Sequence, residues 1–337
     1  FSLGGAVFGM SEESVPFVAI LVPLMLALGY DSIMAVGVTY LACALGFSSA
    51  MLNPFTVGIA QSIAEIPMFS GIEYRTIIWF ITTTVGTLFL MMYATKIKKN
   101  PELSPVCESD KIKRENLTNF GEDKDGFTFT HKIILSLLAL CIGIIVWGVL
   151  TQGFWIPQIA AVFLVTGLAS GIIGRLSGDE MADAFIEGAK GMIGAAIMIG
   201  FARAIVIIAE NASIIDTILY NLAGVIGKLP PLLAACIMYP IQMFINFFVG
   251  SGSGQAALTM PILAPLGDLI GISRQLTVLI FQFGDGFSNV IFPTSGILIA
   301  CLGIAGVPFG KWLKWVMPLQ GILFVLAITF ITIGSLI

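Results

Sequence analysis

Long apolar runs separated by short polar stretches make up most of the chain. A helix that crosses the hydrocarbon core of a bilayer needs about 20 consecutive apolar residues. Uninterrupted runs of this kind predict transmembrane helices over residues 76–95, 132–150, 155–174, 190–209 and 312–336. Other apolar stretches are interrupted by polar residues, glycine or proline, and these interruptions indicate where a solute would bind.

Two of the interrupted stretches are predicted to form helical hairpins. In the first, an apolar arm ends near Gly9 and a second arm covers 15–29, with a polar tip between them. In the second, arms over 232–249 and 256–272 flank the tip 250–255. We expect both hairpins to be re-entrant, so that each tip lies within the membrane.

Two further stretches are predicted to be broken transmembrane helices. Residues 31–66 are too long for one crossing and are interrupted at Ser48-Ser49 and Asn53-Pro54. Residues 273–305 carry a similar interruption that includes Pro293. Proline removes a backbone donor and clashes with the preceding turn, which favours a break. The structural alternative is a pair of proline kinks satisfied by neighbouring helices.

The two halves of the chain match each other weakly. The motif Gly46-Phe47-Ser48-Ser49 corresponds to Gly286-Phe287-Ser288-Asn289, and Pro54 corresponds to Pro293. The polar segment between the halves is rich in Lys and Arg, so the positive-inside rule places it in the cytoplasm and makes the repeats inverted. We therefore predict a first repeat over 1–95, a cytoplasmic polar loop over 96–131, scaffold helices over 132–231, and a second hairpin, broken helix and final helix over 232–337.

Composition narrows the class of protein. Hydrophobic residues make up 57% of the 337 residues and charged residues only 11%, whereas soluble domains are about a quarter charged. The net charge of −4, without a dominant basic stripe, argues against a nucleic-acid partner. No CxxC pair occurs among the five cysteines, which argues against a disulfide scaffold. The sequence predicts an all-α polytopic protein of a bacterial inner or plasma membrane, surrounded by the lipid bilayer.

The first hairpin tip carries Glu12 and Glu13 between apolar arms. A charge at bilayer depth costs at least about 2.5 kcal/mol, so it survives where it faces water, protein or a cation. We interpret both carboxylates as ligands of a substrate ammonium or guanidinium group, or of a coupling cation. The alternative is an ordinary interfacial loop with solvated acids.

The second hairpin tip is neutral and rich in hydrogen-bond donors. It contains Ser251, Ser253 and Gln255 among glycines, and the arm that follows would present free N–H groups and the positive end of its dipole. This combination suits a substrate carboxylate. The alternative is a flexible turn between two helices.

The breaks supply the remaining candidates. Unwound carbonyls with Ser and Asn oxygens are typical of a sodium site, and we take as candidate ligands Ser48, Ser49, Asn53, Gly286 and Ser288. The candidate substrate-binding residues at the breaks are Asn53, Asp285, Asn289 and Thr294. No cofactor is predicted, apart from Na⁺ or H⁺ as a coupling ion.

Several motifs resemble one known family. The YfcC-type branch of the C4-dicarboxylate anaerobic carrier family is similar to this chain at Phe1-Ser2-Leu3-Gly4-Gly5, Gly9-Met10-Ser11-Glu12-Glu13, Pro16-Phe17, Gly29-Tyr30-Asp31 and Asn53-Pro54-Phe55-Thr56-Val57-Gly58-Ile59-Ala60. The resemblance covers nearly the whole chain. It implies membership of the ion transporter superfamily, with inverted repeats, re-entrant hairpins and broken helices around one site.

The resemblance also implies a homodimer that moves a transport domain against a scaffold, like an elevator. Family members begin with more helices before the position of Phe1, so we expect that N-terminal scaffold helices precede it. Members of the family have been linked to dicarboxylates, and others to exchange of basic amino acids. The second Ser-Asn motif also differs from that of sodium–dicarboxylate relatives.

We interpret the chain as a secondary active transporter or exchanger of a small carboxylate-bearing solute, an amino acid such as arginine or ornithine. A dicarboxylate would meet Glu12, Glu13 and Asp285 as three repulsive charges, whereas a zwitterion or cationic amino acid suits both tips. A C4-dicarboxylate carrier is the first alternative and an ion channel the second. An intramembrane enzyme is not expected, because the single histidine leaves no nucleophile–base pair or metal cluster.

Overall fold

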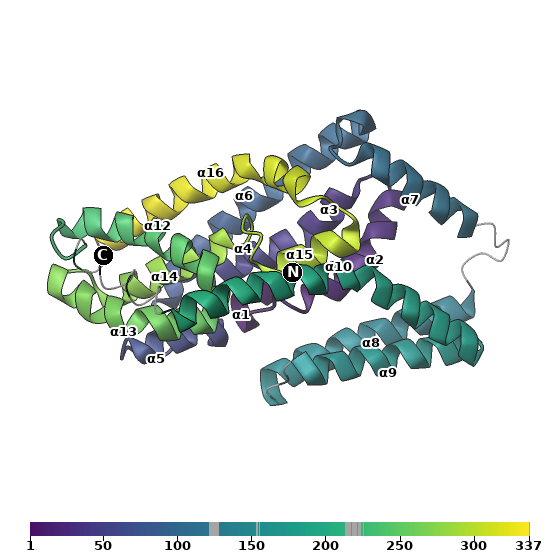
Figure 1. Cartoon of the computed structure of the whole chain (residues 1–337), viewed down its shortest axis with the longest axis horizontal. Coiled ribbons are helices and arrows are strands. Elements are labelled where there is room, and N and C mark those ends of the chain that lie inside the picture. Colours follow the sequence, from purple (N-terminus) through teal and green to yellow (C-terminus); the bar gives the residue numbers. More distant parts are fainter. Residues whose placement is uncertain are drawn as a thin grey trace. The chain divides into compact units, whose positions relative to one another are not determined.

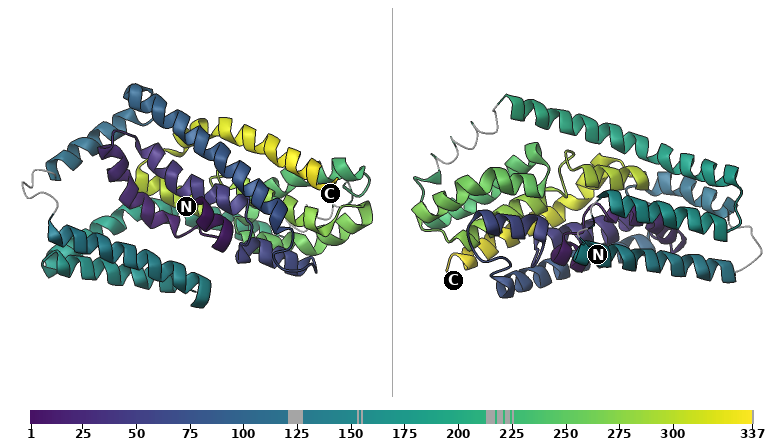
Figure 2. Two further views of the ribbon diagram at one scale, coloured as in Figure 1. Left: turned by 180° about the vertical axis from the view of Figure 1, so that it is seen from behind. Right: turned by 90° about the horizontal axis from the view of Figure 1, so that it is seen from below.

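The computed structural model describes the whole chain except residues 121–127, 153, 155, 213–216, 218–220, 222, 223, 225 and 337. The described residues form helices and loops without a strand, which confirms the all-α prediction. They divide into two compact units (Figures 1 and 2). One unit comprises Phe1–Asp110 with Gly194–Ile337, and the other comprises Lys111–Ile193.

Both predicted hairpins are present in the first unit. The first consists of α1 (Ser2–Phe8) and α2 (Ser14–Ala27), and the second of α12 (Pro231–Val249) and α13 (Gly252–Ile270). The first arm ends at Gly9 with φ 72° and the corresponding arm ends at Gly250 with φ 53°. Glycine enters this left-handed region without steric cost, so it stops each helix and reverses the chain at the tip.

The first broken helix is interrupted where the sequence predicts. A continuous helical stretch is built from α3 (Ser32–Val36), the π-helical segment η1 (Gly37–Leu41) and α4 (Ala42–Ser48). Non-helical residues 49–53 follow, and helix resumes with a second π-helical segment, η2 (Pro54–Gly58), and α5 (Ile59–Ile63). Nothing in the sequence pattern indicated the π-helical turns, which are rare and often lie at functional sites.

The second broken helix has the same form. Helix α14 (Arg274–Ser288) ends just before the second break, residues 289–295, and α15 (Gly296–Ala305) follows it. Each half then closes with a long helix, α6 (Ile72–Lys99) in the first and α16 (Phe309–Gly334) in the second. Among the described helices, α6, α12 and α16 are long and apolar enough to span a membrane.

The packing of the first unit pairs corresponding helices. The arm α1 packs on α4 and α12 packs on α14, while α4 contacts α6 and α14 contacts α16. Across the halves, α2 packs on α15 and α13 packs on α5, so each hairpin contacts the broken helix of the other half. The two broken helices also meet, α4 against α14, and the two long helices lie side by side (Figures 1 and 2). A core cluster of the unit lies between α5, α13 and α14 and includes Ala60, Ala256 and Phe281.

The polar segment predicted as a loop over 96–131 differs in the structure. It contains the short helix η3 (Pro101–Leu103) and α7 (Cys107–Phe120), and residues 121–127 lie outside the described part. Asp110 is buried, and its carboxylate accepts hydrogen bonds from the Ser32 backbone N–H (2.7 Å) and hydroxyl (2.6 Å). Because this carboxylate serves as a partner for the start of α3, the beginning of the segment folds against the first unit.

Part of the predicted scaffold region forms the second unit. Its helices are α8 (Phe129–Gln152), α9 (Ile156–Ile173) and the first part of α10 (Gly178–Asn211). Helices α8 and α9 pack through a small apolar cluster that includes Cys141, Ile145, Phe154, Val162 and Phe163. Much of 213–225, within the predicted 132–231 range, lies outside the described residues.

Candidate functional site

The tip of the first hairpin lies against the first break. A side chain at Gly9 would begin 2.5 Å from Oδ1 of Asn53, so only glycine allows this approach. Asn53 is fully buried, and its Oδ1 accepts a hydrogen bond from the Phe55 N–H at 2.9 Å, which caps η2. Its Nδ2 has no hydrogen-bond partner among the described residues. The tip therefore covers a polar group that has an unused donor.

The tip of the second hairpin lies against both broken helices. A side chain at Gly252 would begin 2.6 Å from Cγ2 of Thr56 and 3.0 Å from Oδ2 of Asp285. Thr56 belongs to η2, one turn after Asn53, and Asp285 lies in the last turn of α14. The two tips, which are far apart in the sequence, therefore contact the same short stretch of the first broken helix.

Asp285 is the most unusual residue of this site. It is fully buried, and neither carboxylate oxygen has a hydrogen-bond partner among the described residues. The hydroxyl of Thr56 and Oε1 of Gln282 are also buried, and neither has a hydrogen-bond partner among the described residues. Burying a polar group without a partner costs a few kcal/mol, and burying a lone charge costs more. A proton, a cation or a polar solute beside Asp285 would remove this cost.

The second break is held by side chains from three different helices. Nδ2 of Asn246 in α12 lies within hydrogen-bonding distance of the Asp285 carbonyl (3.0 Å), the Ser288 hydroxyl (2.7 Å) and Oδ1 of Asn289 (2.9 Å), and these acceptors share its two hydrogens. The hydroxyl of Tyr40 in η1 donates to the Asn289 carbonyl at 2.9 Å. Nε1 of Trp312 in α16 donates to the next carbonyl, that of Val290, at 2.9 Å. These bonds satisfy backbone groups that the end of α14 leaves free.

The first break is held mainly by α1 and α14. The N–H groups of Met51 and Leu52 both donate to the Ala6 carbonyl at 3.0 Å. Nε2 of Gln282 donates to the Phe47 carbonyl at 2.6 Å. At the crossing of the two broken helices, a side chain at Gly286 would begin 2.4 Å from Cα of Ser48. The crossing therefore brings together two residues that the sequence assigned to one sodium site.

The candidate sodium ligands have hydroxyls that bond to their own helices. Oγ of Ser48 donates to the Ala44 carbonyl (2.5 Å) and Oγ of Ser49 to the Leu45 carbonyl (2.6 Å). Oγ of Ser288 likewise donates within α14, to the Gly284 carbonyl at 2.7 Å. Coordination of Na⁺ by hydroxyls uses oxygen lone pairs, and the Ser288 oxygen already accepts a hydrogen bond from Asn246. The described residues contain no cluster of three or more His, Cys, Asp or Glu side chains suited to a metal ion.

Other predicted residues lie in different settings. Glu12 is exposed, and Glu13 is half-buried with its carboxylate accepting from the Ser11 N–H at 3.0 Å. Ser251 is exposed and caps α13 by accepting from the Gly254 N–H. Gln255 is buried inside its hairpin, where Nε2 donates to Oε1 of Gln242 at 2.7 Å. Among the described residues none of these side chains bonds to the Asp285 carboxylate, so their substrate roles stay predictions.

Three further candidates are half-buried: Ser253, Asn289 and Thr294. Asn289 and Thr294 take part in contacts of the second break. Asn289 accepts from Asn246, as described above, and is therefore a support of the break as well as a candidate ligand. The Thr294 carbonyl lies 3.6 Å from where a side chain at Gly250 would begin. This contact of a tip glycine with its own half's break matches that of Gly9 with Asn53.

Sequence reasoning missed one hydroxyl and three amides that complete the site: Thr56, Gln242, Asn246 and Gln282. A signal was present, because Gln242 and Asn246 stand four residues apart within the apolar arm 232–249 and so share one helix face. Polar side chains within membrane helices are costly and usually face the protein interior. Tyr40 and Trp312 had no comparable signal, since aromatic residues are common in such helices.

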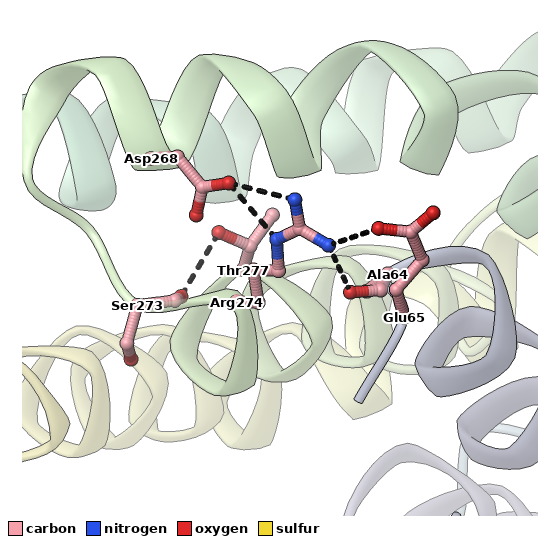
Figure 3. A network of polar contacts seen from close by, with 6 residues as sticks. All are labelled: Ala64, Glu65, Asp268, Ser273, Arg274 and Thr277. Atoms are coloured by element: carbon pink, nitrogen blue, oxygen red, sulfur yellow. Dashed lines mark hydrogen bonds and ion pairs between the residues drawn. The ribbon is translucent and has the colours of Figure 1, made fainter. Parts of the chain in front are cut away.

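A separate ion-pair network ties the halves together at the opposite end of α14. Figure 3 shows Arg274 between Asp268 of α13 and Glu65, which follows α5. Its guanidinium lies 2.9 Å from a carboxylate oxygen of each acid and donates to the Ala64 carbonyl at 2.8 Å. Glu65 is exposed, so this network contributes little stability per pair. It links the second hairpin to the first broken helix.

Comparisons with known proteins agree with the resemblance seen in the motifs. The family described as "DcuC: C4-dicarboxylate anaerobic carrier" matches residues 1–336. An Escherichia coli K12 protein called "Putative basic amino acid antiporter YfcC" is 48% identical, over 99% of this chain and 68% of its own length. An uncharacterised Haemophilus influenzae protein is 35% identical, over 95% of this chain and 63% of its own length.

Among solved structures, the chain is similar in fold to the YdaH transporter of Alcanivorax borkumensis. The TM-score is 0.52 at 17% identity, over 98% of this chain and 76% of that one. At this identity the likeness concerns the fold alone.

Proposed function

Because the chain belongs to the C4-dicarboxylate anaerobic carrier family, we propose that it moves a small carboxylate-bearing amino acid, such as arginine or ornithine, across the bilayer by alternating access. The family is a carrier family and the Escherichia coli relative is named as a putative antiporter, so the chain is a multi-pass membrane protein of a transport family and not an enzyme. The name of the Escherichia coli relative supports a basic amino acid and supports exchange over net uptake.

The buried, unpartnered carboxylate of Asp285 beside the second hairpin tip is the observation that carries the proposal. An ammonium or guanidinium group beside it would supply the missing charge and hydrogen bonds. The donor at Asn53 and the hydroxyl of Thr56 would bind the polar remainder of the solute. A dicarboxylate would instead add negative charge beside Asp285, which is unfavourable where the effective dielectric is low.

The proposed mechanism uses the pairing of the two halves. We take the hairpins as re-entrant and the repeats as inverted, which the exchanged contacts α2–α15 and α13–α5 support. Hairpins and broken helices would then move as one body, in an elevator-like step, while 132–231 would provide scaffold helices and a homodimer contact. We also propose that residues 96–131 lie in the cytoplasm. A coupling Na⁺ would bind near Ser48, Gly286 and Ser288, and H⁺ is the alternative coupling ion.

The decisive experiment is uptake by full-length protein reconstituted in liposomes. Labelled arginine, ornithine and succinate are each offered with an outward gradient of unlabelled solute, with and without a sodium gradient. We expect saturable exchange of the basic amino acids. Uptake of succinate alone would replace the substrate with a dicarboxylate, and an unsaturable ion current would indicate a channel.

Glu12 is a predicted substrate ligand that is exposed at the tip of the first hairpin. We expect Glu12→Gln to reduce basic amino acid uptake, because it removes a carboxylate at the first tip, while the protein still inserts and folds. Uptake kinetics equal to wild type would remove Glu12 from the site. The exposed Glu102→Gln serves as the matched control.

A further inference from the structure

A second buried charge without a partner lies away from Asp285. Arg75, in the first turns of α6, has a relative exposure of only 3%. Both terminal guanidinium nitrogens lack a hydrogen-bond partner among the described residues. A buried guanidinium carries five donors and stays charged, so leaving it unmatched is costly.

The acids nearest to Arg75 in the chain do not account for this charge. Glu73, two residues earlier on α6, is exposed, and side chains two positions apart do not share a helix face. Glu65 pairs with Arg274 at 2.9 Å. The described residues therefore leave the positive charge of Arg75 uncompensated.

The start of α6 adds free donors beside this charge. Its N-cap is Gly71, which has no side chain to bond the N–H groups of the first turn. Helical side chains lean toward the N-terminus of their helix, so the Arg75 side chain extends over this uncapped turn. Together they form a positive, donor-rich place suited to an anion.

This place adjoins the first break. The neighbouring Thr76 hydroxyl lies 3.3 Å from Sδ of Met51, which belongs to the break. Arg75 is the fourth residue of α6, and the fourth residue of α16 is Trp312, which donates to the Val290 carbonyl of the second break. The fourth position of the long helix thus supports the break in the second half, whereas in the first half it holds a buried charge without a partner.

We propose that Arg75 binds the carboxylate of the transported solute at a position separate from Asp285, an inference that rests on the proposed function. A planar guanidinium matches a carboxylate through two parallel hydrogen bonds. A lipid phosphate shares the anionic chemistry, so the test below compares lipids of different headgroup charge. The solute would then meet a cation at one place and Asp285 at another.

The test measures ligand-dependent thermal unfolding of the purified full-length protein in phosphatidylcholine nanodiscs, without transport. The probes are acetate, arginine and agmatine, which is arginine without its carboxylate. We expect acetate and arginine to raise the Tm of wild type. We expect Arg75→Met to abolish the acetate shift and to weaken apparent arginine affinity about tenfold or more. Lys96→Met, which removes an exposed cation from the same helix, should retain both responses.

The variant's own stability separates binding from a structural role. If Arg75 is an empty anion site in the unliganded protein, Arg75→Met should have a Tm at least equal to that of wild type without ligand. The substitution removes a buried charge that has no partner. A lower Tm without any change in probe response would overturn the proposal. So would an acetate shift that persists in Arg75→Met, or the absence of any acetate shift in wild type.

Two further arms identify the source of the anion and separate this inference from the proposed function. A shift that occurs only when phosphatidylglycerol replaces phosphatidylcholine would assign Arg75 to lipid and overturn the solute site. Asp285→Asn should keep the acetate shift, because acetate needs Arg75 alone. If the wild type takes up neither arginine nor succinate but still shows the acetate shift in Tm, the proposed function is contradicted. The anion site at Arg75 is then still supported.

Discussion

At the scale of single residues, Asp285 and Asn53 restrict what the site can accept. One offers a buried carboxylate with two unused oxygens, and the other offers a buried amide with an unused donor. Each is placed by a glycine of a hairpin tip that permits contact, Gly252 for Asp285 and Gly9 for Asn53. The residues themselves are ordinary, and their burial without partners gives them a chemical role.

Asp285→Asn should separate binding from folding. The amide keeps the shape but removes the charge that a cationic solute needs, so we expect basic amino acid exchange to fall at least about tenfold. Because the buried charge has no partner, the Tm should stay equal or rise. Initial exchange rates in liposomes and thermal unfolding measure the two effects, with Glu102→Gln as control. A marked loss of Tm would show that Asp285 is a structural ion-pair member instead.

At the scale of elements, the breaks keep their shape because side chains replace the missing helical hydrogen bonds. The amide of Asn246 alone contacts Asp285 and Ser288 at the end of α14 and Asn289 at the start of the second break. The tip of the second hairpin is equally constrained, since Gly252 lies between Thr56 and Asp285. The Asn246 bonds and the Gly252 contacts both join different helices, and each can be tested with a single substitution.

Asn246→Ala should loosen the second break. The Asp285 carbonyl keeps the Ser288 hydroxyl as a donor, but Oδ1 of Asn289 loses its bond to Asn246, at about 1–3 kcal/mol for a buried acceptor. The Tm should therefore fall and amide exchange should speed up over 289–295. Hydrogen-exchange mass spectrometry localises the effect. Unchanged protection in this segment would mean that Tyr40 and Trp312 suffice to hold it.

Gly252→Ala should displace the second hairpin tip. The added methyl would meet Thr56 Cγ2 at 2.6 Å, and overpacking of this kind costs about 1–3 kcal/mol. Exchange activity should therefore drop more than for Gly310→Ala, where the structure has open space. Equal activity of the two variants would show that the tip does not pack tightly against the broken helices.

At the scale of the whole molecule, the two halves of the first unit pack across each other. Each hairpin packs on the broken helix of the other half, and the two broken helices cross at Gly286 and Ser48. One pair of side chains marks the contact between the first hairpin and the second broken helix, because Oγ of Ser14 in α2 lies 3.9 Å from Sγ of Cys301 in α15. A movement that keeps hairpins and broken helices together would preserve this distance.

Ser14→Cys should form a disulfide with the native Cys301 under mild oxidation, because the two side chains already approach each other. Peptide mass spectrometry detects the bond, and Cys301→Ser in the same background removes it. If hairpin and broken helix move as one body, the oxidised variant keeps its exchange activity. Loss of activity that a reducing agent restores would instead show that the first hairpin must separate from α15.

The sequence by itself determined the class, both hairpins and both interruptions, because apolar runs, glycines and prolines act on the backbone within a few residues. It also identified Asp285 and Asn53 as candidates. Only the tertiary structure decided that these two lie under opposite tips, that Asn246 holds the second break, that Arg75 is buried unpaired, and that the predicted loop contains α7. These outcomes depend on contacts between residues up to hundreds of positions apart, and local periodicity carries no information about them.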